Sequence, residues 1–128
     1  QWTNDGIRPE EIGVFVRSEK EVPRGQAAIQ AAGLKSHPIR DTYQSQPGTV
    51  LLSTMHLAKG LEFRAVAVMA CDDEVIPSQD RIEAIADTAD LEDIYNTERQ
   101  LLYVACTRAR DHLLITATSP ASEFLDDL

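Results

Sequence analysis

The sequence has no hydrophobic run that approaches the roughly 20 residues needed to span a bilayer. No N-terminal stretch shows the basic-then-apolar pattern of a secretory signal peptide. Only two cysteines are present, Cys71 and Cys106, and they lie in unlike settings that form no cluster of metal ligands. These absences predict a cytoplasmic protein with reduced thiols and no membrane partner.

Positive charge is also scarce, because 12 Lys and Arg stand against 21 Asp and Glu and give a net charge of −9. Such a balance argues at first against nucleic acid as a partner. The acids are concentrated, however, since segment 72–93 holds nine of them and a single base, Arg81. The rest of the chain is close to neutral, so a locally basic face elsewhere remains allowed.

Length and hydropathy predict one folded domain over residues 1–128, because 43% hydrophobic residues suffice for a buried core. Residues 1–10 are polar and contain Gly6 and Pro9, which predicts a lead-in loop. Segment 72–93 is expected to be an acidic loop or helix. For its second part, 82–93, a solvated loop is favoured over an acidic helix.

Apolar runs and helical spacings alternate along the chain. Strands are expected at 11–17, 37–40, Thr49–Thr54, 65–70 and 112–117, and helices at 23–33 and 91–109, with a short terminal helix capped by Ser119. Two of the strand runs are apolar without alternation, as in strands that are buried on both faces. The pattern therefore predicts an α/β domain with a mainly parallel sheet flanked by helices.

A first block of polar residues, STMHLAKGLEF, begins at the end of a buried strand. Ligands of open α/β sheets bind outside the carboxyl ends of the strands, so this block is well placed for one. Thr54 and His56 can offer hydrogen bonds to a phosphate backbone, and Lys59 adds a cation. Gly60 lets the main chain pass close to a ligand, and Glu62 can accept hydrogen bonds from sugar hydroxyls. Taken singly, a Thr-x-His after a strand is more often a plain turn, and a lysine is more often a solvated charge.

A second block, ERQLLYVACTRAR, lies in the last expected helix. On a continuous helix Arg99 shares one stripe with Tyr103, Cys106 and Arg110, whereas Arg108 points roughly the opposite way. One arginine can then reach a phosphate while the other braces the domain. Guanidinium suits a developing phosphoryl charge because it is always cationic and presents a planar fork. Without context, such arginines are more often salt-bridge partners of nearby acids.

Together, STMHLAKGLEF and the later ERQLLYVACTRAR resemble motifs V and VI of superfamily 1 helicases of the UvrD/Rep type. The upstream stretch IGVFVRSEKEVPRGQAAIQAAGL is similar to that family's strand–helix segment just before the insertion in its second motor domain. The resemblance covers residues 11–118. It implies the C-terminal, RecA-like motor domain of an ATP-dependent DNA helicase, which is of the P-loop NTPase type but lacks the P-loop itself.

In that family two RecA-like domains clamp ATP and Mg²⁺ between them, and hydrolysis moves the pair along single-stranded DNA. By resemblance, Thr54 and His56 match positions that touch the DNA strand. Lys59 and Gly60 match the Lys-Gly pair of the loop between DNA and nucleotide, with the lysine assigned to DNA and the glycine to ATP. Glu62 matches the acid that approaches the ATP ribose.

Motif VI of the family supplies an arginine to the γ-phosphate, as an arginine finger does in other phosphoryl-transfer enzymes. The resemblance makes Arg99 the candidate finger and ATP contact, with Arg108 as the alternative finger or a structural residue. Tyr103, Thr107 and Arg108 match positions that couple this helix to the rest of the motor. Many members carry a second arginine next to the leucine, where this chain has Gln100. A one-residue shift rotates a helical side chain by about 100°, so the sequence leaves open which arginine is the finger.

The chain has no Gly-x-x-x-x-Gly-Lys-Ser/Thr and therefore no phosphate cradle of its own. The resemblance accordingly implies the N-terminal RecA-like domain of the same polypeptide as a partner, with the fragment alone inactive and holding no tightly bound cofactor. Asp72, Asp73 and Glu74 follow a strand, but they come after motif V, where acids are expected in a solvated loop. No metal site is predicted. Only a short segment separates Arg40 from Thr49, so the extra domain that larger helicases insert there is expected to be absent.

The sequence is also compatible with two alternatives to a motor domain. One is a non-hydrolytic nucleic-acid-binding or regulatory interaction domain with a helicase-like fold, which Gln100 supports. The other is a nuclease–helicase fusion, which nothing in these residues tests. A phosphate-loop motif upstream in the parent gene would favour the motor over the binding module.

Overall fold

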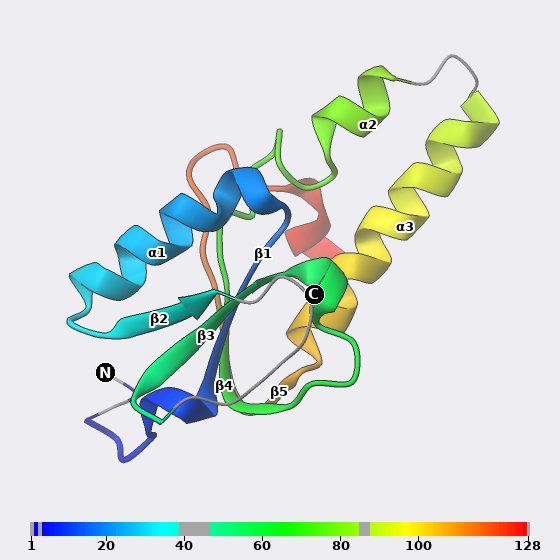
Figure 1. The fold of residues 1–128 in the computed structure, drawn as a ribbon. Helices are drawn as coiled ribbons and strands as arrows, with labels where there is room; N and C mark the ends of the chain where they lie inside the picture. Colours follow the sequence, from blue (N-terminus) through cyan, green and yellow to red (C-terminus); the bar gives the residue numbers. More distant parts are fainter. Residues whose placement is uncertain (1, 3, 39–46, 85–87, 128) are drawn as a thin grey trace.

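Five parallel strands form one sheet in the described part of the protein (Figure 1). The structure is a computed structural model that describes residues 2, 4–38, 47–84 and 88–127. The strands are β1 (Ile12–Val16), β2 (Lys35–Pro38), β3 (Thr49–Thr54), β4 (Phe63–Val68) and β5 (Ala109–Ile115), in the spatial order β2-β3-β1-β4-β5. The expected α/β fold is confirmed, and every neighbouring pair in this sheet is parallel.

The two faces of the sheet bury two separate apolar clusters. Along β1, Ile12, Val14 and Val16 face one cluster, whereas Phe15 faces the other. Helix α1 (Val22–Ala31) covers the first cluster through Ile29. Helix α3 (Thr88–Cys106) covers the second. The central strands are therefore buried on both faces, which explains why their sequences are apolar without alternation.

The end of α1 follows the sequence prediction. Gly33 has a positive φ of 79°. Its N–H donates to the Gln30 carbonyl, and the N–H of Leu34 donates to the Ile29 carbonyl at 3.1 Å. This pair of bonds is a Schellman motif, in which glycine is favoured because the left-handed conformation carries no Cβ penalty.

The boundary between the last helix and the last strand was predicted wrongly. The stripe of apolar residues suggested a helix to 109 and a strand from 112, but α3 ends at Cys106 and β5 already begins at Ala109. Ala109 is paired with Phe63 in the β4–β5 ladder, and the Phe63 N–H donates to the Arg108 carbonyl at 2.9 Å. Tertiary pairing with β4 therefore overrides the helical pattern at these residues.

Three smaller predictions also need correction. The edge strand expected at 37–40 begins at Lys35 and ends at Pro38, and residues 39 and 40 lie outside the described residues. Ser122, not Ser119, accepts the hydrogen bond of the terminal 3-10 helix η4 (Glu123–Asp127), from the Phe124 N–H at 3.2 Å. The acidic segment contains helix α2 (Gln79–Glu83) and the start of α3, so the preferred loop is wrong there, while 85–87 lie outside the described residues.

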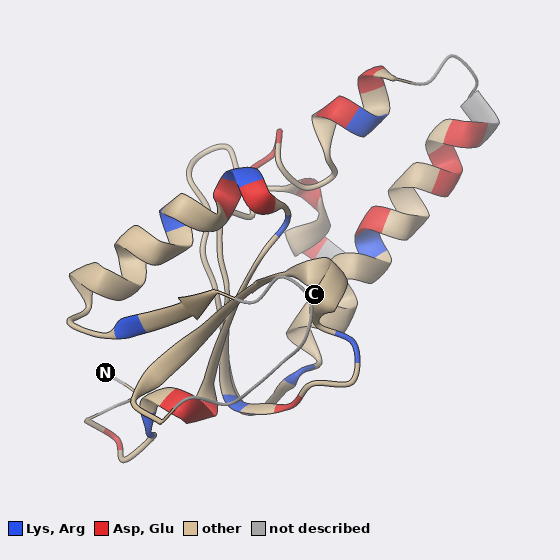
Figure 2. Cartoon of the chain, viewed as in Figure 1, with Lys and Arg blue, Asp and Glu red and all other residues tan. Residues whose placement is uncertain are grey.

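Acidic residues are concentrated on the part of the molecule that projects from the sheet. Figure 2 shows them along α2 and the first half of α3, which extend beyond the sheet together. The strands themselves carry few charges, and these lie near the strand ends. Within the described ranges, no helix is long and apolar enough to cross a membrane.

Candidate functional site

The first two predicted site residues lie at the carboxyl end of β3. Thr54 is the last residue of that strand, is 8% exposed and lies in register with Val16 of β1. The short 3-10 helix η3 (Met55–Leu57) follows, with Met55 buried in the core and His56 exposed. Burial of Met55 anchors the turn, so the side chain of His56 is presented outside the carboxyl edge of the sheet, where the sequence placed it.

Next to this turn, a buried carboxylate joins four segments of the fold. Glu98 of α3 is fully buried and accepts two hydrogen bonds from Arg17, from Nε at 2.8 Å and from Nη2 at 2.6 Å. It also accepts one from the Ser78 N–H at 2.6 Å and one from Arg81 Nη1 at 3.0 Å. Arg17 directly follows β1 and is itself only 6% exposed. The carboxylate therefore links β1, the segment before α2, α2 itself and α3. Its two oxygens accept these four hydrogen bonds.

Neither Arg17 nor Glu98 was among the site residues predicted from the sequence. A signal was present, because Glu98 lies three residues after Tyr95 and four before Leu102, on the apolar stripe of its helix. A charged residue on a buried stripe needs a partner inside the fold. Nothing local identified Arg17 as that partner, since 81 positions separate the two.

This cluster sets the charge state of two groups. Burial by itself would raise the pKa of Glu98, but the hydrogen bonds from Arg17 and Ser78 and the charge of Arg81 outweigh it, so the pKa is lowered. The pKa of His56 is also lowered, by partial desolvation of its largely exposed ring and by the positive charges of Arg17 and Arg81, against the opposing effect of Glu98. At neutral pH Glu98 is therefore ionised and His56 is an uncharged imidazole, which donates one hydrogen bond and accepts another.

The loop from Lys59 to Glu62 leads away from the carboxyl edge. The Leu61 N–H donates to the carbonyl of buried Ala58 at 3.1 Å, which closes a four-residue turn. Gly60 is its third residue and has a φ of +82°, a conformation for which glycine is strongly preferred. Lys59 is exposed at the tip of this turn.

Glu62 directly precedes β4 and so lies at the amino edge of the sheet, opposite Thr54 and His56. A strand of six residues such as β3 spans roughly 20 Å. A small hollow of about 320 Å³ opens beside Glu62, lined by Glu10, Glu11, Glu62, Phe63, Arg64 and Arg110. The structure therefore does not bring Glu62 together with the DNA-side candidates.

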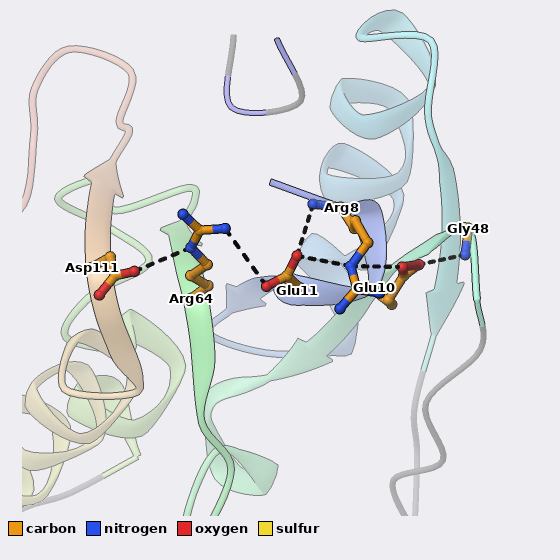
Figure 3. Close-up of polar contacts among 6 residues, drawn as sticks. All are labelled: Arg8, Glu10, Glu11, Gly48, Arg64 and Asp111. Carbon is orange, nitrogen blue, oxygen red and sulfur yellow. Dashed lines mark hydrogen bonds and ion pairs between the residues drawn. The ribbon is translucent and has the colours of Figure 1, made fainter. Parts of the chain in front are cut away.

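Ion pairs link neighbouring segments along this amino edge of the sheet. Figure 3 shows Glu11 between Arg8, at 3.1 Å, and Arg64, at 3.9 Å, with Arg64 also paired with Asp111 at 3.2 Å. These pairs join the start of β1 to β4 and β5. Arg64 is thus engaged with acids of the chain itself, while Glu62 stands outside this network in the described contacts.

The two candidate arginines have different surroundings. Arg99 lies one residue after Glu98, on the flank of α3, with its guanidinium carbon 4.7 Å from the centre of the Phe124 ring. Its Nη1 donates to Asn96 Oδ1 at 3.4 Å. Arg108 lies just after the helix and donates from Nε to the Val104 carbonyl at 3.1 Å. Arg108 thus satisfies a carbonyl at the end of α3, which favours the bracing role over the finger.

Other members of the second block lie as follows. Tyr103 is 62% exposed and Gln100 is exposed, so both face solvent on α3. Arg110 was expected on the stripe of Arg99, but that prediction is wrong because the residue belongs to β5. The candidate finger therefore stands apart from Arg110 and next to the buried Glu98.

Of the acids after β4, Asp72 serves the fold. Asp72 pairs with Arg24 of α1 at 2.6 Å and accepts the Thr118 N–H at 2.7 Å. Burial would raise its pKa, but these bonds lower it. In the part of the chain that the structure describes, no group of three or more potential ligand side chains is placed to hold a metal ion.

Known proteins that are similar to this chain are helicases or domains of helicases. Residues 17–120 match the model of the UvrD-like helicase C-terminal domain. A putative ATP-dependent DNA helicase YjcD from Bacillus subtilis (strain 168) is 45% identical over 69 residues, or 52% of this chain. The ATP-dependent DNA helicase PcrA from Staphylococcus aureus (strain MRSA252) is 46% identical over 71 residues, or 55% of this chain. In each case the match covers 9% of the helicase.

A solved structure shares the fold over nearly the whole chain. It is the C-terminal domain of a possible DNA helicase from Lactobacillus plantarum WCFS1, with a TM-score of 0.68 and 28% sequence identity. The match covers 96% of this chain and 63% of that one.

Proposed function

Because the chain belongs to the UvrD-like helicase C-terminal domain family, we propose that it is the second motor domain of an ATP-dependent enzyme that moves along single-stranded DNA. Residues 1–128 form a single domain in this proposal. The N-terminal RecA-like domain of the same polypeptide is its partner across the ATP cleft. The intact protein works in the cytoplasm, where bacterial DNA is accessible to it.

The DNA contacts are assigned to the turn that follows β3. Thr54 and the neutral imidazole of His56 offer hydrogen bonds to phosphate oxygens, and Lys59 supplies a positive charge. Support comes from their position, since Thr54 and His56 lie outside the carboxyl edge of a parallel sheet. The acidic residues of α2 and the first half of α3 lie on a projection that extends beyond the sheet (Figure 2), and the tip of that projection does not need to approach the DNA.

The ATP contacts are assigned to Gly60, Glu62 and Arg99. The carboxylate of Glu62 accepts hydrogen bonds from ribose hydroxyls, and the guanidinium of Arg99 stabilises the charge that develops on the γ-phosphate. ATP supplies the phosphoryl group that is transferred to water. Within the described residues no acidic cluster fits Mg²⁺, so the metal ligands and the phosphate cradle are assigned to the N-terminal motor domain.

The observation that carries the proposal is the buried carboxylate of Glu98. It is bound by Arg17, which follows the strand in register with Thr54, and it directly precedes Arg99 on α3. A shift of the DNA-side turn relative to β1 would therefore be transmitted to the helix that bears the candidate finger. Such a connection is what a motor requires between its DNA and ATP sites.

The proposal is tested by ATP hydrolysis in the full-length protein, with and without single-stranded DNA. Arg99→Ala should lower DNA-stimulated turnover by roughly 10³-fold or more and leave DNA affinity nearly unchanged. Arg8→Ala is the matched control, because Arg8 is exposed and pairs only with Glu10 and Glu11 in the described contacts.

Two other outcomes would contradict parts of the proposal. Unchanged turnover in Arg99→Ala would reject it as the finger and direct the search to Arg108. No hydrolysis in the wild type would reject the motor and favour the non-hydrolytic interaction domain, for which the glutamine at position 100 argues.

A further inference from the structure

The side chain of Arg99 lies over an aromatic ring that comes from the far end of the chain. Its guanidinium carbon is 4.7 Å from the centre of the Phe124 ring. Phe124 is 1% exposed and also contacts Tyr95 of α3 edge to face, with ring centres 5.8 Å apart. The ring thus fills the space beneath the flank of α3 on which Arg99 stands.

The backbone around Phe124 is held firmly by the segment that follows β4. The Phe124 N–H donates to Ser122 Oγ at 3.2 Å, and the Ser122 N–H donates to the Cys71 carbonyl at 2.8 Å. The Asp73 N–H donates to the Pro120 carbonyl at 3.0 Å. The segment after β4 therefore fixes η4, and with it the ring of Phe124, relative to the sheet.

The segment after β4 also holds the residue that precedes Arg99. Ser78 donates its N–H to Glu98, the residue just before Arg99, at 2.6 Å. Because Glu98 is locked in the core, the backbone of Arg99 has little freedom to move. The guanidinium of Arg99 donates to Asn96 Oδ1 and rests on the ring of Phe124.

An aromatic ring does more for a guanidinium than an aliphatic side chain of similar size. The negative face of the ring attracts the cation, while the N–H groups at the edge of the guanidinium plane stay available for hydrogen bonds. A ring in this position holds the charge at one place without consuming all its donors. That is the property required of a group that must meet a γ-phosphate in a defined geometry.

We propose that Phe124 is a positioning residue for Arg99, whose aromatic face holds the guanidinium ready for the γ-phosphate of ATP. The inference rests on the proposed function, since it takes Arg99 as the finger. Phe124 acts only through Arg99 and contacts neither ATP nor DNA.

The test uses the full-length protein and a double-mutant cycle on DNA-stimulated ATP hydrolysis. Phe124→Leu should lower kcat about 10-fold and change KM for ATP by less than about twofold, because it removes the attraction of the ring and leaves most of the apolar volume. Phe124→Tyr, which keeps the ring, should restore kcat to near the wild-type value. In the Arg99→Ala background, Phe124→Leu should have no further effect on kcat.

Controls separate positioning from plain packing. Phe15→Leu removes another fully buried ring, which packs edge to face on Phe63 at 6.0 Å, and variants are compared at equal folded fraction. Phe124→Met is a second ring-free variant for use if Phe124→Leu does not fold. Both ring-free variants should lower kcat by more than Phe15→Leu.

The possible outcomes test the positioning role of Phe124 separately from the assignment of Arg99 as the finger. A loss of kcat in Phe124→Leu that persists in the Arg99→Ala background would overturn the inference, as would a loss no larger than that of Phe15→Leu. If Arg99→Ala abolishes turnover but Phe124→Leu does not affect it, the finger stands and the positioning role is rejected. If Arg99→Ala has no effect, the finger assignment itself is wrong.

Discussion

Arg17 and Glu98 form a bidentate ion pair in which both side chains are almost completely buried, although they are 81 positions apart in the sequence. The pair joins the carboxyl end of β1 to the middle of α3. Arg81 and the Ser78 N–H complete the coordination of the carboxylate. Since the turn with Thr54 and His56 and the candidate finger Arg99 lie on either side of this pair, its loss should affect stability and coupling together.

Removal of the Glu98 carboxylate should strongly destabilise the fold. Glu98→Ala leaves the buried guanidinium of Arg17 without its partner, so we expect a loss of about 3–5 kcal/mol in the free energy of unfolding. Urea unfolding followed by circular dichroism measures this. Glu92→Ala is the control, because Glu92 is exposed on the same helix. A loss below about 1 kcal/mol would mean that the pair contributes little.

Stability should also fall in acid because of this carboxyl group. The pKa of Glu98 in the folded protein lies below its ordinary value of 4.5, so the unfolded chain binds the proton first as the pH drops. The contribution is fully present above the unfolded pKa and is lost as the pH falls through the lowered, folded pKa. Urea midpoints of wild type between pH 7 and pH 3 should therefore decline below about 4.5, and Glu98→Gln should show a shallower decline. Parallel curves would contradict the assignment.

His56 and Lys59 should affect DNA binding in different ways. Because the pKa of His56 is lowered by partial desolvation and by nearby arginines, the imidazole is neutral at pH 7.5 and its loss should weaken binding without changing the salt dependence. Lys59→Ala should reduce the slope of log K against log salt by about 0.7, the value for one phosphate contact on a single strand. Fluorescence anisotropy with a labelled single strand measures both.

Lys35→Ala serves as the control for this pair, because Lys35 is exposed at the amino end of β2, on the opposite edge of the sheet. Its slope and affinity should match the wild type. An equal change of slope in His56→Ala and Lys59→Ala would show that the imidazole is charged when DNA binds.

Two glycines offer a matched test of packing. A Cβ at Gly13 of β1 would lie 2.7 Å from the ring of Phe63, which is buried and packed on Phe15. We expect Gly13→Ala to cost about 1–3 kcal/mol. At Gly25 of α1 the Cβ would meet the end of the flexible Leu52 side chain at 2.8 Å, and the gain of about 1 kcal/mol in helix propensity offsets the strain.

Urea midpoints of the two variants, measured side by side, decide this point. Gly13→Ala should be the less stable by more than about 1 kcal/mol. Equal losses would mean that the Phe63 ring moves aside as easily as the Leu52 methyl group.

The sequence was sufficient to predict that the five strands exist and most of the α1 boundary, although β2, β4 and β5 each begin two or three residues earlier than expected. The apolar runs at β3 and β4 were long enough to identify, and Gly33 marked the helix stop by its own conformational preference. The end of α3 was not predictable from periodicity, because the apolar stripe continues to Ala109 while that residue pairs with β4. Helix α2 within the acidic segment was missed for a similar reason, because it is held by a tertiary contact between Arg81 and Glu98.

The candidate site likewise has features that the sequence predicts and features that it does not. The positions of Thr54 and His56 follow from the end of a strand, which is a local feature. The partnership of Arg17 with Glu98 and the ring of Phe124 beneath Arg99 depend on contacts between distant segments. No local pattern specifies such contacts, so the register of Arg99 relative to its supports was visible only in three dimensions.

The order of the strands has a consequence for biosynthesis. β1 is the first strand to be made and the middle strand of the sheet, and its register partners include Leu51 on β3 and Ala65 on β4. Every pairing in the sheet is parallel and needs a crossover, so the contacts that complete the fold are distant in sequence, and folding is expected to be slow for a chain of this length. A ribosome that synthesises this domain therefore releases its most apolar strand well before either neighbour exists, and that strand must be kept from other chains until β3 and β4 emerge.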